Sequence, residues 1–543
     1  MDFHKISHTL LSHRSSSRIY QDLAYCRSTF QEYSDDTVPK PIMESDMKFR
    51  EKNSLAKPAS ICIVGAGISG LRCADVLLQN GFDVTILEAR DRIGGRVTQQ
   101  KLSTGHLVDL GANWIHGTES NPILDLAKAT NTATHDWGES FNIFDEDGKL
   151  VKDGKEMNDT LWGIIVQAFK HSAENTATID PKESLYDFFL EKVQGIFPSK
   201  DESKEREIMM QMTEMWGAFV GSPVQTQSLK FFWLEECIDG ENLFCAGTYQ
   251  KILGTIAKSA LAGSKMKLST KVTSVETHSN RIIVSTENGD FLEFGEIIIT
   301  CPLGWLQKNK KVFNPELPAR FSQAIDAIGY GTLEKVYITF PRAFWLGNEG
   351  HPDEKPHTGF TQWTAPAYTS PTNPERWNQE VVDLATLPGN CAHPTLLFYL
   401  YGAQSVSFGK ELSTRPTEEE RNIYLASFFK PYYSLLPHYD ADSVDCAPLQ
   451  CLATTWILDD LAGNGSYTTI RTGVMEADKD IEIMREGLPG RSVWFAGEHT
   501  APFVALGTVT GAYWSGENVA RRIVSSYGME VIKDGGEDEG GGK

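Results

Sequence analysis

The chain has 543 residues, of which 41% are hydrophobic and 23% are charged, and its formal net charge at pH 7 is −21. This length predicts two domains, each large enough for its own hydrophobic core. The negative charge argues against nucleic acid as a partner and is compatible with a cationic ligand or with solubility alone. No apolar run approaches the roughly 20 residues of a membrane-spanning helix, so stable membrane insertion is not expected.

Both ends of the chain differ in composition from the rest. Residues 1–57 contain polar clusters with little periodicity and predict a mostly disordered extension. Basic residues outnumber acidic ones at its start, which leaves a mitochondrial transit peptide open, although the apolar content is low. The tail, 528–543, is expected to be flexible and lacks the Ser-Lys-Leu ending of peroxisomal proteins.

Nine cysteines are scattered along the chain without pairing or metal-binding spacing. Dispersed cysteines of odd number favour reduced thiols, and therefore a cytoplasmic protein without a structural metal site. Mitochondrial or peroxisomal import stays open, and the sequence leaves the oligomeric state undetermined.

The most informative stretch begins with two short apolar runs, 61–64 and 84–87, which predict buried parallel strands. A helical pattern lies between them and opens with three glycines, Gly65, Gly67 and Gly70, while Glu88 ends the second run. Strand, glycine turn, helix, strand and acid form the βαβ fingerprint of dinucleotide-binding folds.

Each residue of this fingerprint has a physical role. Gly65 makes the tight turn, Gly67 lets the backbone approach a pyrophosphate, and Gly70 lets the helix pack on the strand. The helix N-terminus offers free N–H groups and a partial positive charge to the phosphates, and Glu88 accepts the ribose hydroxyls. The glycines that follow bring more backbone close to the ligand, and Arg96 offers a guanidinium for a phosphate.

Further along the chain, apolar patterns predict other elements. Helical patterns occur at 124–129, 160–169, 207–220 and 417–431. Strand patterns occur at 267–276, 281–287, 291–294, 296–300, 335–340 and 395–401.

Four separated motifs resemble, in the same order, those of FAD-dependent amine oxidases, and above all the flavin-containing polyamine oxidases. They are GAGISG with EARDRIGGR behind it, DLGANWIHG at 109–117, KVYITF at 335–340, and FAGEHT with GTVTGAYW at 495–514. The resemblance covers roughly residues 58–527. It implies an α/β protein in which a Rossmann-like FAD-binding domain of the GR2 type is interleaved with an α+β substrate-binding domain. The FAD-binding domain would comprise 58–120, 245–330 and 452–527, and the substrate-binding domain 121–244 and 331–451.

The resemblance also implies how FAD is held. The Val272 backbone would contact the adenine, and Glu498 would bond to the ribityl chain. The amides of Thr508 and Val509 would face the N1/O2 edge of the flavin, where a helix N-terminus stabilises negative charge. Monoamine oxidases carry their flavin-tethering cysteine where this chain has Ser466, so FAD is expected to be non-covalent.

Catalytic and substrate-binding residues follow from the same resemblance. Lys335 would lie buried beside the flavin and hold a water at N5, whereas on its own a lysine at a strand end more often reaches solvent. His116 is expected to be catalytic and, with Trp114 and Tyr467, to bind the substrate. Tyr467 matches one wall of an aromatic sandwich whose other wall falls at Ala505, so the cavity is wider there or Phe503 takes that place. Several acids could bind an ammonium group without any being assigned: Glu119, Asp136, Glu139, Glu235, Glu236 and Asp239.

The expected function is FAD-dependent oxidation of polyamines such as spermine, spermidine or their N-acetyl forms, with dioxygen as the acceptor. The products would be an aldehyde, a shorter amine and hydrogen peroxide. A FAD oxidase of another amine or of an L-amino acid is an alternative, although no arginine can be assigned to a substrate carboxylate. A FAD-fold protein that binds a ligand without catalysis is a second alternative. Histone demethylation is disfavoured, because no long helical insertion or chromatin-binding module is evident.

Overall fold

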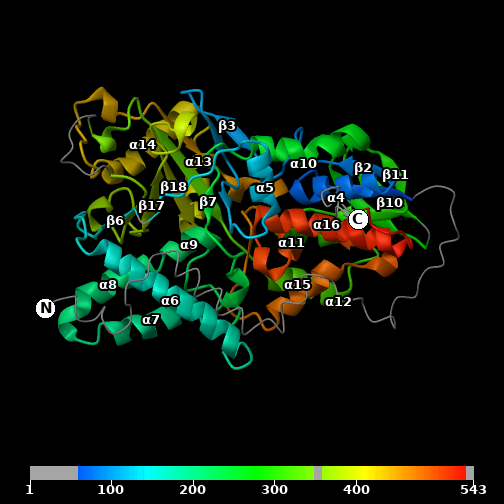
Figure 1. The fold of residues 1–543 in the computed structure, drawn as a ribbon, viewed down its shortest axis with the longest axis horizontal. Helices are drawn as coiled ribbons and strands as arrows, with labels where there is room; N and C mark the ends of the chain where they lie inside the picture. Colours follow the sequence, from blue (N-terminus) through cyan, green and yellow to red (C-terminus); the bar gives the residue numbers. More distant parts are fainter. Residues whose placement is uncertain (1–58, 139, 280, 348–356, 533–543) are drawn as a thin grey trace, which may run out of the picture.

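The computed structural model describes residues 59–347 and 357–532, except residues 139 and 280. Two lobes lie side by side in it, one built on a five-stranded parallel sheet and the other on a six-stranded mixed sheet (Figure 1). The extension predicted for residues 1–57 and most of the predicted tail lie outside the described residues. The α/β fold class expected from the sequence is confirmed.

The parallel sheet of the first lobe has the strand order β21-β12-β1-β2-β8. In its central strand β1, Ile61 and Ile63 face one hydrophobic core, and Cys62 and Val64 face another. Since both faces are covered, the strand is apolar throughout, as is usual in parallel sheets. Helices α4, α10 and α16 cover one face, where Figure 1 shows them together. The bounds are β1 Ser60–Val64, α4 Ile68–Gln79, β2 Asp83–Leu87, α10 Gln250–Gly263, β8 Lys265–Lys267, β12 Glu296–Ile299, β21 Val493–Phe495 and α16 Val509–Ser526.

A single strand over 267–276 is a wrong prediction, because the chain changes sheet within this range. It leaves β8, turns at Ser269, whose φ is +49°, and enters a four-stranded sheet of order β11-β10-β9-β13. The Ser269 and Thr270 amides bond to the carbonyls of Arg90 and Glu88, which holds the turn against the nucleotide-binding segment. The bounds are β9 Val272–Thr277, β10 Ile282–Thr286, β11 Phe291–Phe294 and β13 Phe313–Asn314.

The six-stranded sheet of the second lobe has the order β19-β15-β18-β17-β16-β6. On one face, Val336, Phe398 and Val381 belong to a hydrophobic core completed by helices α13 and α14. The residues next to them in sequence point to the opposite face, since side chains alternate along a strand. The bounds are β6 Phe141–Phe144, β15 Leu333–Thr339, β16 Phe360–Trp363, β17 Gln379–Asp383, β18 Thr395–Tyr401, α13 Gly402–Ser413, α14 Glu418–Tyr433 and β19 Gln450–Ala453. The boundary expected at residue 452 therefore cuts β19.

Helices between residues 154 and 220 form a separate group with its own core, at the lower left of Figure 1. One helix over 207–220 is a wrong prediction, because α8 ends at Met212 and α9 begins at Met215. At the start of α9 the amides of Trp216 and Gly217 bond to the carbonyls of Thr213 and Glu214, three residues back, in a tighter turn than an α-helix allows. The bounds are α6 Gly154–Asn175, α7 Leu185–Ile196, α8 Ser203–Met212 and α9 Met215–Val220.

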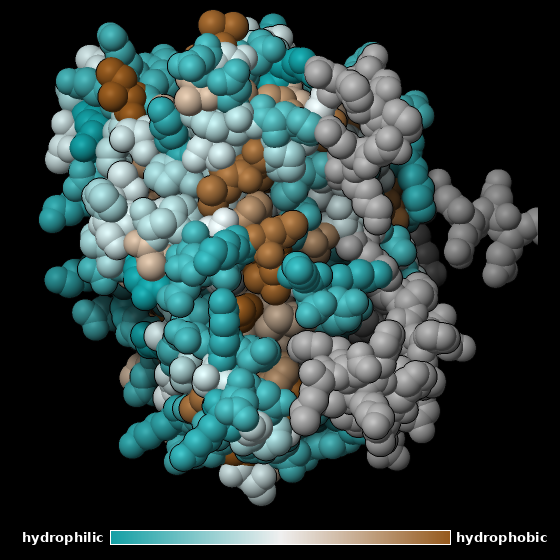
Figure 2. Space-filling model, turned by 90° about the vertical axis from the view of Figure 1, so that its left-hand side faces the viewer, coloured by the Kyte–Doolittle hydropathy of each residue, from teal (hydrophilic) through white to brown (hydrophobic). Residues whose placement is uncertain are grey.

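The face of the molecule seen in Figure 2 is mainly polar, and its apolar residues gather in a band that runs down the middle of this face. Within the described ranges, no helix combines the length and the apolar character needed to cross a membrane.

Candidate active site

A cavity of about 540 Å³ is lined by residues of both lobes and of the helical group. Pockets of this size typically hold a small molecule or part of a cofactor. Twelve of the residues predicted from the sequence line it: Gly65, Gly67, Glu88, Arg96, Trp114, His116, Val272, Lys335, Tyr467, Glu498, Thr508 and Val509. Gly70 and Ala505 do not.

The three fingerprint glycines have different surroundings. Gly65 has a φ of +112°, and a Cβ built on it would lie 2.5 Å from Thr300 Oγ1. A Cβ on Gly70 would lie 2.1 Å from the Gly65 carbonyl oxygen, so this glycine is needed for packing. A Cβ on Gly67 would meet nothing within 4 Å. The free space lies at the cavity, beside the N-terminus of α4, and this fits the close approach of a pyrophosphate.

Glu88 is fixed at the end of β2 beside the glycine turn. Its Oε2 accepts the Ala66 amide at 2.7 Å and its Oε1 accepts the Arg90 amide at 2.8 Å. The carboxylate therefore stabilises the turn itself, while carboxylate oxygens keep lone pairs for ribose hydroxyls. Val272, the first residue of β9, is buried and lines the same end of the cavity.

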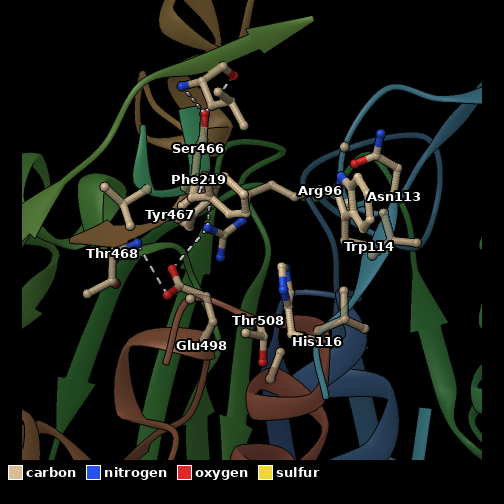
Figure 3. A pocket seen from close by; sticks show the side chains of 18 of the residues that line it. Arg96, Asn113, Trp114, His116, Phe219, Ser466, Tyr467, Thr468, Glu498 and Thr508 are labelled. Carbon is tan, nitrogen blue, oxygen red and sulfur yellow. Dashed lines mark hydrogen bonds and ion pairs between the residues drawn. The ribbon is translucent and has the colours of Figure 1, made fainter. Parts of the chain in front are cut away.

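Arg96 and Glu498 form an ion pair, with Arg96 Nη1 at 3.0 Å from Glu498 Oε1. The same nitrogen donates to the Ser466 carbonyl at 2.6 Å, and the Thr468 amide donates to Glu498 Oε2 at 3.3 Å (Figure 3). These contacts hold the loop that follows the fingerprint against the strand end that delivers Glu498. The phosphate contact of Arg96 stays a prediction, since the guanidinium already faces a carboxylate.

Helix α16 begins at the cavity. Thr508 caps it, because its Oγ1 accepts the Gly511 amide at 2.9 Å. The first amides of a helix have no partner within the helix and carry its positive end. The N-termini of α4 and α16 thus both lie at the cavity, which fits a ligand with a pyrophosphate and with a second group that gains negative charge on reduction.

Lys335 lies on β15 and is 4% exposed, so the solvent-reaching alternative does not apply. Its Nζ donates to the carbonyl of Gly111, and lies 3.4 Å from that of Asp109. Burial lowers the pKa of Lys335 to about 7, although the nearby Asp109 and Glu334 oppose that change. Lys335 is thus a buried amine, held by main-chain oxygens at the cavity wall, that can gain or lose a proton near neutral pH.

The predicted aromatic and imidazole residues surround the same space. His116 Nδ1 lies 3.3 Å from Asn242 Oδ1, and burial lowers the pKa of His116, which favours the neutral ring. The Tyr467 hydroxyl donates to the Phe219 carbonyl at 2.6 Å. Figure 3 shows Tyr467 and Glu498 on one side and Trp114 with Asn113 on the other, with His116 between them.

The wall opposite Tyr467 differs from the prediction. Ala505 is buried in a 3₁₀ turn and does not line the cavity, and Phe503 does not replace it. The Phe503 ring packs edge-on against Trp233, and the Arg485 guanidinium lies over this ring, 4.8 Å from its centroid. Leu506 and Gly507 line the cavity there instead.

Ser466 is buried and engaged with the main chain. Its Oγ donates to the Leu333 carbonyl and accepts the Leu333 amide, both at 2.8 Å. A serine held in this way has no chemistry for tethering a flavin, which agrees with a non-covalent cofactor.

Sequence reasoning found Lys335 on the second sheet but missed the cavity residues that three other strands of this sheet supply. Tyr399, Phe360 and Glu380 line the cavity from β18, β16 and β17. The Tyr399 hydroxyl accepts the Asn113 side-chain amide at 3.0 Å and the Trp114 indole at 3.1 Å. No local signal marked Glu380, because its strand, QEVVD, also carries Gln379 and Asp383.

Comparisons with known proteins agree with this geometry. A protein-family model described as "Flavin containing amine oxidoreductase" matches residues 68–524. Probable polyamine oxidase 4 of Arabidopsis thaliana is 27% identical over 91% of this chain and 92% of its own length. Polyamine oxidase 2 of the same plant is 25% identical over 89% and 94%. Lysine-specific histone demethylase 2 of Homo sapiens is 26% identical over 86% of this chain but 53% of its own length. The chain belongs to the flavin-containing amine oxidoreductases, and FAD, held without a covalent bond, is the cofactor that its two helix N-termini and glycine turn accommodate.

Proposed function

We propose that this protein oxidises polyamines with dioxygen as the acceptor and releases an aldehyde, a shorter amine and hydrogen peroxide. The observation that carries the proposal is the mixture of aromatic and acidic side chains that line the cavity together with Lys335. It combines the aromatic rings of Trp114, Phe360 and Tyr399 with acids, and desolvation raises the pKa values of two of them, Glu235 and Glu380, to about 7. Apolar walls suit a methylene chain and acids suit ammonium groups.

The cationic side chains of the cavity argue against an amino-acid substrate. Two arginines are in the described lining, Arg90 and Arg96. Arg90 forms an ion pair with Asp459 at 2.8 Å, and Arg96 pairs with Glu498. Both follow the nucleotide fingerprint in sequence, so neither offers a free guanidinium to a substrate carboxylate.

Bound FAD would supply the acceptor for the hydride equivalent that leaves the amine carbon, and dioxygen would take up the electrons. The protein positions the amine and excludes water from it. A neutral His116 and a Lys335 of lowered pKa limit the positive charge that an incoming cation meets. The histone demethylases are about as similar in sequence as the polyamine oxidases. However, this chain matches nearly the full length of two plant polyamine oxidases and about half of the human demethylase, which supports the smaller substrate.

The experiment is a substrate panel on the purified holoprotein. Flavin bleaching without oxygen, and peroxide release with oxygen, are measured with spermine, spermidine, N-acetylspermine, alkyl monoamines, L-amino acids and a methyl-lysine histone peptide. We expect polyamines to give the highest kcat/KM. Bleaching by the peptide or by an amino acid, with none by polyamines, would refute the proposal, and a protein that keeps its FAD without being bleached by any of them would be a non-catalytic binder.

A further inference from the structure

Four polar side chains form one row across the six-stranded sheet. Lys335 on β15 is paired in register with Tyr399 on β18, Tyr399 with Glu380 on β17, and Glu380 with Gln362 on β16. Directly opposite residues point to the same face of a sheet. The first three of them line the cavity. Since neighbouring strands lie about 4.8 Å apart, Glu380 is roughly 10 Å along the row from Lys335.

Glu380 is the member of this row whose hydrogen-bonding capacity is only partly used. It is 8% exposed, and its Oε2 accepts one hydrogen bond, from Gln362 Nε2 at 2.7 Å. Among the described residues, no cation pairs with it and no donor reaches Oε1. A carboxyl group this deeply buried is almost always paired in folded proteins, because an unpaired buried charge is costly.

Three other acids of the cavity already have hydrogen-bond or ion-pair partners. Glu88 accepts two main-chain amides, Glu235 accepts the Ile470 amide at 3.0 Å, and Glu498 pairs with Arg96. Glu380 therefore differs from them in having room for a cationic donor that the described protein does not supply. The Tyr399 ring, fixed by Asn113 and Trp114, separates it from Lys335 and presents an apolar surface between the two.

We propose that Glu380 binds a second, non-reacting ammonium group of the substrate, an inference that rests on the proposed function and narrows it. The reacting nitrogen lies near Lys335, the methylene chain crosses Tyr399, and the next nitrogen pairs with Glu380. The site then selects di- and polyamines over monoamines of the same chain length. Glu380 is thus a specificity-determining residue.

The test compares Glu380→Gln with the unmutated holoenzyme on an aliphatic diamine and on the monoamine that has a methyl group in place of the second nitrogen. We expect the ratio of the two kcat/KM values, diamine over monoamine, to fall about 10- to 100-fold, as for loss of a hydrogen bond to a charged group. Glu380→Asp, which keeps the charge on a shorter stem, should retain part of the preference. Flavin absorbance shows that each variant is folded and loaded.

Glu334→Gln is the matched control. Glu334 is buried beside Lys335 in β15, and burial raises its pKa to about 7 as well, but its carboxylate accepts Thr454 Oγ1 and the Ile457 amide and does not line the cavity. Its ratio should stay within about twofold of the unmutated enzyme. An unchanged ratio in Glu380→Gln, or an equal fall in Glu334→Gln, would overturn the inference while amine oxidation itself stands. If no amine bleaches the unmutated protein, the proposed function fails and this inference fails with it.

Discussion

Replacing Lys335 with methionine tests directly whether the buried amine assists the reduction and reoxidation of the flavin. Methionine keeps most of the buried stem and removes the amine that the Gly111 and Asp109 carbonyls hold. We expect the variant to fold and to remain yellow, because the nucleotide end of the cavity is untouched. Reduction by amine and reoxidation by dioxygen should both slow, and the effect on reoxidation should be the larger, because a cation favours electron transfer to oxygen.

The magnitude follows from what is removed. A hydrogen bond that involves a charged group contributes about 1.5–3 kcal/mol, and each 1.36 kcal/mol of barrier changes a rate tenfold, so losses of about 10- to 100-fold are expected. Burial lowers the pKa of Lys335 to about 7. The cationic form is therefore present below this pH and is lost above it. Reoxidation of the unmutated enzyme should slow as the pH rises through about 7, and in Lys335→Met it should be slow on both sides. Asp109 and Glu334 are the acids whose charges act on this amine, and burial raises the pKa of each to about 7. The pH dependence therefore belongs to these three groups together.

Stopped-flow spectroscopy separates the two half-reactions. Bleaching of the flavin is followed after anaerobic mixing with spermine, and the return of colour after mixing the reduced protein with oxygenated buffer. If both rates in Lys335→Met stay within about twofold of the unmutated protein, a barrier difference of only roughly 0.4 kcal/mol, Lys335 has no role at the flavin.

Three further predictions concern the cofactor and the buried acids. Glu88→Ala should weaken FAD binding about 10-fold or more and also lower the melting temperature, because it leaves the Ala66 and Arg90 amides without their acceptor; unchanged occupancy on dilution would contradict this. Gly67→Ala should fold as the unmutated protein does but bind FAD poorly. Gly70→Ala should lose stability even without FAD, since its Cβ meets the Gly65 carbonyl. Equal melting temperatures of the two apoproteins would contradict these different roles of the two glycines. Burial raises the pKa of Glu380 from an ordinary 4.5 to about 7, so between these values the folded protein keeps a proton that the unfolded chain has released, and stability falls as pH rises. Glu380→Gln should remove that contribution, so the free energy of unfolding of the variant, relative to that of the unmutated protein, should rise from pH 4.5 to 7 and then level off. If chemical denaturation gives the same difference in unfolding free energy at every pH, Glu380 keeps an ordinary pKa.

The nucleotide half of the site could be predicted because each of its residues acts locally. The glycines, the helix start and Glu88 lie within one stretch of chain, and their roles depend on backbone conformation and on one adjacent strand. The strand over 267–276 was predicted wrongly for the opposite reason. Its break at Ser269 depends on carbonyls of Glu88 and Arg90, far away in sequence. The prediction that Ala505 forms a wall of the cavity was wrong for a similar reason. Matching a motif does not reveal that the residue lies in a short 3₁₀ turn and is buried in the protein.

The proposed selection of a second ammonium group depends on the register of β17 against β18, which no local pattern specifies. Side chains alternate along a strand, so a slip of one residue would place Val381 in the cavity and turn Glu380 into the core. The hydrophobic row on the other face prevents this, because Val336, Phe398 and Val381 pack together beneath α14. The same register that buries these apolar side chains therefore sets the spacing of Lys335, Tyr399 and Glu380. A relative that keeps the flavin motifs but places an apolar residue at the position of Glu380 should keep the oxidation chemistry and lose the preference for a second ammonium group.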